Sequence, residues 1–154
     1  MSIEDDIAFF ERVPTLALLG RTALRILAIG AENRYVHSGE VLFQAGDPAD
    51  AGFVVQEGSF NLVAPATDGV KTSTAGPGTL LGELALLTDT TRPVTATALE
   101  PATVLRIPRT LFLKMLEGFP DAAGRLRDEF ASRTNQSARD MYVVRSVLDI
   151  PEER

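Results

Sequence analysis

Glycine and proline punctuate the middle of this 154-residue chain and leave only short apolar runs between them. From Tyr35 onward, turn-forming residues separate β-branched and aromatic stretches about every eight to twelve positions. The turn signals are Gly39, Gly46, Asp47-Pro48, Gly58, Asp68-Gly69 and Gly76-Pro77-Gly78. This spacing suits antiparallel strands in a sandwich or barrel and leaves no room for the helices of βαβ units. The sequence therefore predicts an α+β fold that is mainly β.

Helical patterns precede this β region. Residues 4–13 carry acidic residues where a first helical turn would lie, and residues 20–31 place Leu24, Leu27 and Ala28 at helical spacing. We therefore expect N-terminal helices over residues 1–32, followed by a β-sandwich or β-barrel over residues 33–108.

Two more helices follow the last strands. Residues 94–108 predict a strand pair that turns at Glu100-Pro101, and residues 109–119 predict a short helix. A longer helix is predicted to begin at Asp121 as its N-cap. We expect C-terminal helices over residues 109–150 and a single domain over residues 1–154.

The composition excludes several classes of protein. The chain has no cysteine and one histidine, His37, so thiolate chemistry and imidazole metal clusters are excluded. A net charge of −6 argues against nucleic acid as a partner. No apolar run approaches the roughly 20 residues that cross a bilayer, and the acidic N-terminus is unlike a secretory signal. We expect a cytoplasmic domain that has no metal and binds neither membrane nor nucleic acid.

The segment GELALLTDTTRPVTATA, residues 82–98, places a carboxylate and a guanidinium on either side of a polar loop. A turn that begins at Gly82 and Glu83 presents unpaired backbone N–H groups, and Arg92 adds a planar cation that can hold two phosphate oxygens at once. An ionised Glu83 only accepts hydrogen bonds, so it suits the hydroxyls of a ribose. Together these groups describe a nucleotide site. The alternative is a surface ion pair beside a hairpin, worth about 0–1 kcal/mol.

This segment closely resembles the phosphate-binding cassette of the cyclic nucleotide-binding domain family, where Gly-Glu-(Leu/Ile)-(Ala/Gly)-Leu precedes a loop, an arginine and a Thr-containing strand. Residues 13–28 are similar to the family's N-terminal helices, and residues 38–63 to its first barrel strands. The resemblance implies an eight-stranded antiparallel jelly-roll barrel and a bound cyclic nucleotide. It also implies C-terminal helices that move over the site when the ligand binds.

The resemblance also assigns roles within the cassette, residues 82–95. Glu83 matches the acceptor of the ribose 2′-hydroxyl, and Arg92 matches the ligand of the cyclic phosphate. Gly82, Leu84 and Ala85 match the turn and short helix whose amides surround that phosphate, and Pro93 and Val94 complete the predicted ligand-binding segment.

Candidate contacts to the base come from two parts of the chain. The barrel candidates are Val54, Leu62 and Leu80, for which ordinary barrel core is the alternative. The long C-terminal helix offers Arg133, Asn135 and Gln136, because amide side chains can pair with N6 and N7 of adenine. A solvated helix surface is the alternative for these three.

Pro93 departs from the family pattern. Members commonly have Ala, Ser or Thr after the arginine, with a backbone N–H that reaches the phosphate, and proline has none. The lost hydrogen bond is worth about 1.5–3 kcal/mol, so affinity would fall roughly ten- to a hundredfold unless Thr90 or Thr91 substitutes. Pro93 also restricts Arg92 to extended dihedrals. Because position 93 lacks the hydroxyl that guanine-selective members use, cAMP is favoured over cGMP.

Two hypotheses for function follow. The first is a non-catalytic cyclic nucleotide sensor whose output passes to a partner protein, or to a homodimer through the C-terminal helix. The second, motivated by Pro93, is a degenerate domain that binds no cyclic nucleotide and acts as a protein-interaction module. A cupin-type metalloenzyme is excluded by the single histidine, and no second base or activated nucleophile accompanies Arg92 for catalysis.

Overall fold

Two four-stranded antiparallel sheets form the body of the structure, a computed structural model that describes residues 2–66 and 69–132. The strands are β1 (Glu32–Val36), β2 (Val41–Phe43), β3 (Pro48–Ala49), β4 (Ala51–Glu57), β5 (Phe60–Ala66), β6 (Gly69–Ala75), β7 (Leu80–Leu81), β8 (Thr90–Thr91), β9 (Thr95–Ala98) and β10 (Ala102–Pro108). One sheet has the order β1-β10-β4-β7, the other β2-β9-β5-β6, and β3 pairs with β8 as a separate ribbon. This mainly antiparallel arrangement confirms the predicted jelly-roll fold class.

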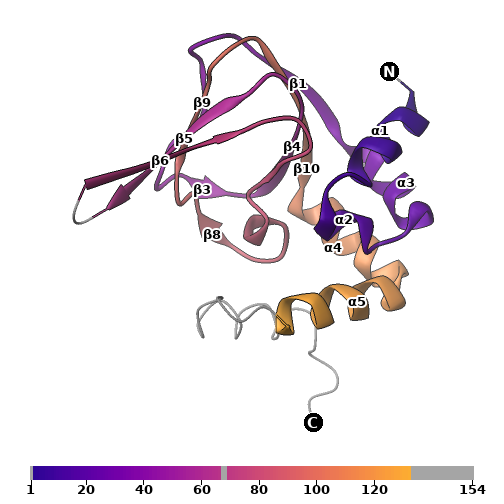
Figure 1. The fold of residues 1–154 in the computed structure, drawn as a ribbon. Helices are drawn as coiled ribbons and strands as arrows, with labels where there is room; N and C mark the ends of the chain where they lie inside the picture. The colour runs from indigo at the N-terminus through magenta and orange to yellow at the C-terminus, as the bar shows by residue number, and fades with distance from the viewer. Residues whose placement is uncertain (1, 67–68, 133–154) are drawn as a thin grey trace.

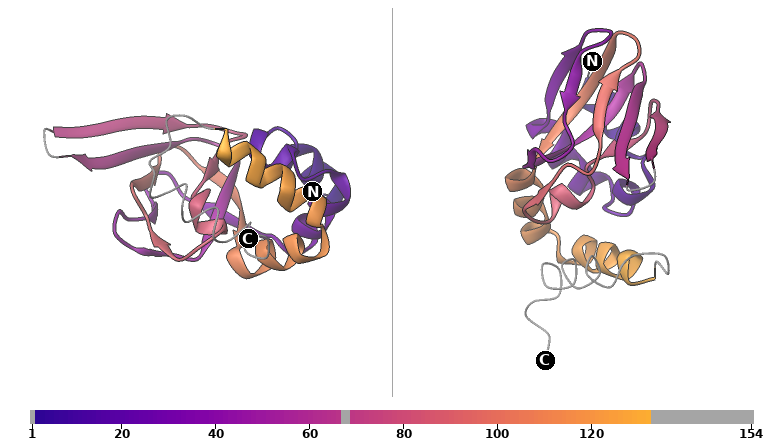
Figure 2. Two further views of the ribbon diagram at one scale, coloured as in Figure 1. Left: turned by 90° about the horizontal axis from the view of Figure 1, so that it is seen from below. Right: turned by 90° about the vertical axis from the view of Figure 1, so that its left-hand side faces the viewer.

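The helices lie together at one side of the sheets, while the β5–β6 hairpin projects from the opposite side (Figures 1 and 2). They are α1 (Ile3–Phe10), α2 (Pro14–Ala17), α3 (Arg21–Gly30), the 3₁₀ turn η1 (Leu84–Leu86), α4 (Arg109–Gly118) and α5 (Pro120–Ala131). Within residues 2–66 and 69–132, every helix is too short or too polar to reach across a bilayer. The predicted continuation of the long helix beyond residue 132 lies outside the described residues.

Local sequence explains how several elements begin and end. Ser2 caps α1, because its Oγ accepts from the Asp5 amide at 3.1 Å and the Asp5 carboxylate accepts from the Ser2 amide. Four of the predicted turn glycines adopt the left-handed φ that these turns require, between 82° and 93°: Gly39, Gly46, Gly58 and Gly78. The turn signals in the sequence therefore mark the strand boundaries correctly.

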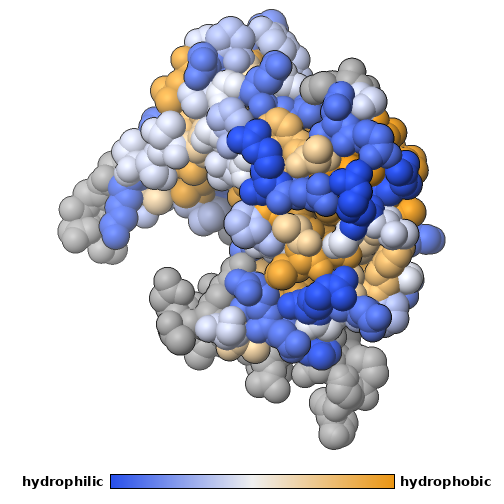
Figure 3. Space-filling view, turned by 45° about the vertical axis from the view of Figure 1, so that its right-hand side comes forward, coloured by the Kyte–Doolittle hydropathy of each residue, from blue (hydrophilic) through white to orange (hydrophobic). Residues whose placement is uncertain are grey.

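The core has two parts. The sheet-side core lies between the two sheets, and it includes Val36, Phe43, Phe53, Val55, Phe60, Leu81, Ala96 and Val104. The helix-side core lies between the β1-β10-β4-β7 sheet and the helices, and it includes Ile7, Phe10, Leu16, Leu24, Leu27, Val54, Leu105, Ile107, Phe112, Leu126 and Phe130. Strand β4 contributes alternate residues to the two parts, as the two-residue period of a strand requires. On the helical side, hydrophobic patches reach the surface between hydrophilic ones (Figure 3).

Three sequence expectations differ from the structure. Strands β9 and β10 do not pair with each other, because β9 joins β2 and β5 while β10 joins β1 and β4. The N-cap of α5 is Phe119 rather than Asp121, because Pro120 occupies the first helical position, where its missing N–H costs nothing. The short helix α2, which begins at Pro14, was not predicted as a separate element.

Candidate nucleotide site

The cassette residues line one pocket. Its walls come from β3, from the turn at Gly82 and η1, and from β8 with the two residues that follow it. The lining residues are Ala49, Gly82, Glu83, Leu84, Ala85, Thr90, Thr91, Arg92 and Pro93. The fold thus brings both halves of the predicted cassette together around one space.

Gly82 is required at its position for two physical reasons. Its φ of +84° is a conformation that other residues adopt only with strain. A Cβ atom at this position would lie 2.5 Å from Arg92 Nη1 and 3.3 Å from the Ala51 carbonyl oxygen. Only glycine therefore lets the cassette turn pass this close to the guanidinium.

Two aromatic rings hold the guanidinium of Arg92. Its central carbon lies 4.4 Å from the ring centroid of Phe43 and 5.3 Å from that of Phe53, and the two rings stack at 5.9 Å. Arg92 is only 5% exposed, so these cation–π contacts form in a largely dehydrated setting, where they are strongest. The rings fix the direction of the side chain without using its hydrogen-bond donors.

Backbone hydrogen bonds fix the main chain of Arg92 as well. Its N–H donates to the Asp47 carbonyl and its carbonyl accepts from the Gly46 N–H, both at 2.8 Å. The residue before a proline favours extended backbone, so Pro93 further restricts the main chain of Arg92. Arg92 thus enters the site from an anchored strand end.

One nitrogen of this buried cation lacks a hydrogen-bond acceptor. Nη1 of Arg92 is inaccessible to solvent, and it donates to no group among the described residues. Burial lowers the pKa of the Arg92 guanidinium, and the nearby carboxylates of Asp50 and Asp47 partly oppose that shift. Since buried donors in proteins are nearly always paired, Nη1 lacks, within residues 2–66 and 69–132, the acceptor that such a donor normally has.

Glu83 forms a hydrogen bond with a residue of the N-terminal helices. The Thr15 hydroxyl, on α2, donates a short hydrogen bond to Oε2 of Glu83. Thr15 is buried, whereas Glu83 is partly exposed and lines the pocket. The carboxylate therefore sits between α2 and the space beside Arg92.

Backbone amides of η1 are partly used within the turn itself. The Ala85 amide donates to the Gly82 carbonyl at 3.1 Å, and the Leu86 amide donates to the Glu83 carbonyl at 3.2 Å. The predicted phosphate contact of the Ala85 amide therefore competes with a hydrogen bond that the turn already makes. Arg92 is the main source of positive charge at the site.

The barrel candidates for contact with the base lie on two faces of the fold. Val54 and Leu80 belong to the helix-side core, on the other face of the sheet from Phe53 and Leu81, and their contact with the base stays a prediction. Leu62 and Val94 pack against the sheet-side core, which contains the rings beside Arg92. Arg133, Asn135 and Gln136 lie outside the described residues.

Three residues of the site were missed by sequence reasoning. Phe43 and Phe53 are separated from Arg92 by about 40 to 50 positions, and Thr15 from Glu83 by 68. Aromatic residues in predicted strands are ordinary core signals, and a threonine in a helical turn carries no signal at all. These contacts arise only when the chain folds.

Comparison with known families agrees with this geometry. The profile of the cyclic nucleotide-binding domain matches residues 33–119, more than half of the chain. The chain belongs to the cyclic nucleotide-binding domain family. The matched segment contains the whole of the pocket lining, from Ala49 to Pro93.

Individual relatives share this domain. The chain is 31% identical over 116 residues to the lysophospholipase NTE1 of Chaetomium globosum, covering 74% of this chain and 8% of that protein. It is 32% identical over 98 residues to the cAMP-dependent protein kinase regulatory subunit of Yarrowia lipolytica, covering 64% and 25%. A solved structure of a cyclic nucleotide-binding-like protein from Brucella abortus is 36% identical, with a TM-score of 0.65, and covers 73% of this chain and 98% of that one.

The cyclic nucleotide-binding domain is a small part of those longer relatives. The chain spans no more than a quarter of the length of either curated relative. The match therefore concerns the domain rather than the remaining parts of those proteins.

Proposed function

We propose that this domain is a non-catalytic sensor that binds a cyclic nucleotide, with cAMP preferred over cGMP. The observation that carries the proposal is the buried Nη1 of Arg92, which has no acceptor in the described part of the chain and belongs to a residue that lines the cassette pocket. A cyclic phosphate supplies both the negative charge and the oxygen acceptors that this guanidinium needs. The hydrogen bond formed there would be sheltered from water, which strengthens it.

Glu83 supports a nucleotide rather than a simple anion. An ionised carboxylate repels phosphate but accepts from hydroxyl donors, and Glu83 lines the same pocket as Arg92. The two side chains therefore suit a ligand that carries one anionic end and neighbouring hydroxyls, as a ribose cyclic phosphate does. A free inorganic anion would leave the role of Glu83 unexplained.

The preference for cAMP rests on position 93 and on one relative. Pro93 lines the pocket and has no hydroxyl that could recognise guanine. The curated relative from Yarrowia lipolytica is the regulatory subunit of a cAMP-dependent kinase. Thr90 and Thr91 also line the pocket, so their hydroxyls are placed to replace the phosphate donor that Pro93 removes.

The first residue of α4 offers a route from the site to the C-terminal helices. Nη1 of Arg109 donates to the carbonyls of Ala49, Ala85 and Thr88 at 2.9, 3.2 and 3.0 Å, and its Nη2 donates to Asp89 at 2.6 Å. Because Arg109 belongs to α4, these hydrogen bonds would transmit a movement of the cassette on ligand binding to α4. We propose that this linkage passes the signal to α4 and α5, and from there to a partner protein or a second copy of the domain.

Calorimetry tests the proposed ligand. The protein is unfolded and refolded to remove bound nucleotide, and then titrated with cAMP, cGMP and 5′-AMP. We expect micromolar or tighter binding of cAMP, weaker binding of cGMP, and the weakest binding of 5′-AMP, which lacks the cyclic phosphate. Arg92→Met should abolish binding, whereas the exposed control Arg25→Met should leave it unchanged. No heat from folded wild-type protein would refute the sensor proposal and favour a protein-interaction module.

A further inference from the structure

The hydrogen bond between Thr15 and Glu83 joins two distant parts of the chain at the edge of the pocket. The Thr15 hydroxyl is the donor and Oε2 of Glu83 is the acceptor. Thr15 does not line the pocket, whereas Glu83 does. Thr15 therefore contacts the candidate ribose acceptor without being part of the pocket lining.

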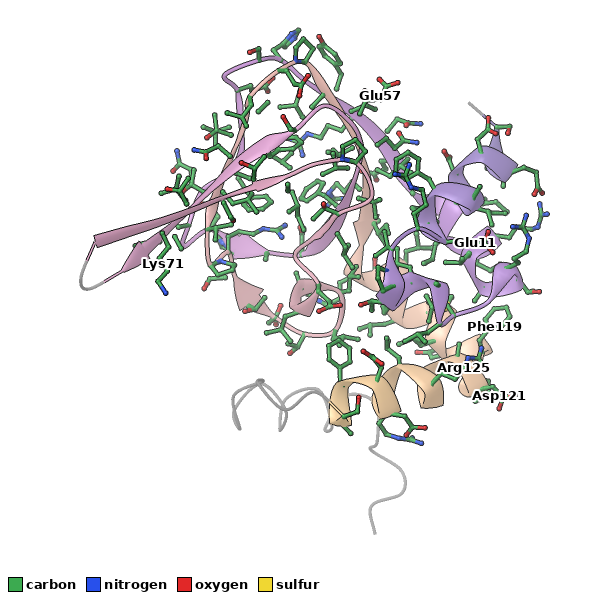
Figure 4. All side chains as sticks on the ribbon, viewed as in Figure 1. Glu11, Glu57, Lys71, Phe119, Asp121 and Arg125 are labelled. Atoms are coloured by element: carbon green, nitrogen blue, oxygen red, sulfur yellow. The ribbon has the colours of Figure 1, made fainter. Side chains whose placement is uncertain are left out.

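Thr15 is held on a well-anchored turn. Its neighbour Leu16 is fully buried in the helix-side core. Arg125 of α5 reaches back to the end of the same turn, where its Nε donates to the Leu18 carbonyl at 2.6 Å and its Nη2 donates to the Leu19 carbonyl at 3.3 Å (Figure 4). Because the turn is fixed from both sides, the Thr15 hydroxyl has little freedom to move.

The groups that bond to the Glu83 carboxylate set its direction. A glutamate side chain has three rotatable torsions, and Glu83 begins a turn of only three residues at a partly exposed position. A carboxylate can accept about four hydrogen bonds, so bonding to Thr15 orients the group and still leaves capacity for a hydroxyl of the ligand.

We propose that Thr15 is a positioning residue that orients the Glu83 carboxylate toward the ribose 2′-hydroxyl, and thereby sets the selectivity of the site for ribonucleotides. This inference rests on the proposed cyclic nucleotide function. Thr15 does not line the pocket, and the proposed effect on the ligand passes through Glu83. The role therefore predicts a change in selectivity for the 2′-hydroxyl rather than a general loss of affinity.

The test compares two ligands on wild type and two variants. Wild type, Thr15→Val and Thr15→Ser are titrated with cAMP and with 2′-deoxy-cAMP, which lacks only the hydroxyl that Glu83 is proposed to accept. A hydrogen bond to a charged group predicts that wild type prefers cAMP by roughly ten- to a hundredfold. Valine has the shape of threonine without the hydroxyl, and it should reduce this preference about three- to tenfold by weakening cAMP alone. Serine keeps the donor and should retain the preference within about twofold.

The outcomes separate this inference from the proposed function. Failure of wild type to bind cAMP would overturn both. If wild type binds cAMP, three results for Thr15→Val would overturn the role of Thr15 alone. These are an equal loss of affinity for both ligands, no change in affinity, and tighter binding of cAMP. If Thr15→Val does not fold, Thr15→Ala provides the same comparison, because it also removes the donor.

Discussion

Replacing Arg92 with methionine should make the empty protein more stable while it abolishes nucleotide binding. Methionine has a similar length and packs well on the rings of Phe43 and Phe53, with a sulfur–aromatic contact worth about 0.3–1.5 kcal/mol. It therefore replaces most of the packing of Arg92, and it leaves no buried charge behind.

The magnitude follows from three contributions. Burying Nη1 without an acceptor costs about 1–3 kcal/mol. The cation–π contacts return about 0.5–2 kcal/mol, which the sulfur contact of methionine roughly replaces. We expect Arg92→Met to raise the free energy of unfolding by about 1–2 kcal/mol, which corresponds to a rise in Tm of about 2–8 °C for a domain of this size.

Thermal unfolding with and without cAMP provides the assay. Wild type at a ligand concentration of about 100 times Kd should gain about 2.7 kcal/mol, whereas Arg92→Met should gain nothing. The order of stability should therefore reverse when cAMP is added, and the control Arg25→Met should follow wild type. An Arg92→Met protein that is less stable than wild type without nucleotide, or that cAMP still stabilises, would refute this reasoning.

Three further predictions concern the turn, the coupling and the core. Gly82→Ala should lower the free energy of unfolding by about 1–3 kcal/mol in urea titrations, because alanine is strained at the positive φ of Gly82 and its Cβ clashes with Arg92. The same variant should show no cAMP binding by calorimetry, and unchanged affinity would contradict this. Arg109→Met should leave cAMP able to bind but remove the cAMP-dependent change in hydrogen exchange of α4 and α5, and a retained change would argue against the coupling route. Burial raises the pKa of Asp6, whose carboxylate accepts a hydrogen bond from Gln56. The free energy of unfolding therefore falls as pH rises through the folded-state pKa of Asp6 and the buried carboxylate becomes charged. Asp6→Asn should therefore be more stable than wild type in urea at pH 7, with the difference vanishing below the ordinary pKa of 3.8, and equal stability at pH 7 would refute this.

The features that could be predicted from the sequence are those encoded over short distances. Turn glycines marked the strand ends because a positive φ leaves few alternatives. The cassette was recognised because Gly82, Glu83 and Arg92 lie within one segment, and the turn and strand end that carry them form locally. Such local features can be recognised in the sequence before the rest of the fold is known.

The features that could not be predicted depend on which face a residue occupies. Strand β4 is buried on both faces along most of its length, so its sequence does not alternate and does not reveal that Val54 faces the helix-side core. The turn between β9 and β10 resembles a hairpin in sequence, but the chain passes there from one sheet to the other. The contact of Thr15 with Glu83 requires the relative placement of helix and barrel.

A crystal structure of the complex with cAMP tests the central claim most directly. The account predicts an oxygen of the cyclic phosphate within about 3.2 Å of Arg92 Nη1, with the ribose 2′-hydroxyl donating to Glu83. A nucleotide bound away from the cassette, or one whose phosphate leaves Arg92 Nη1 still without an acceptor, would contradict it.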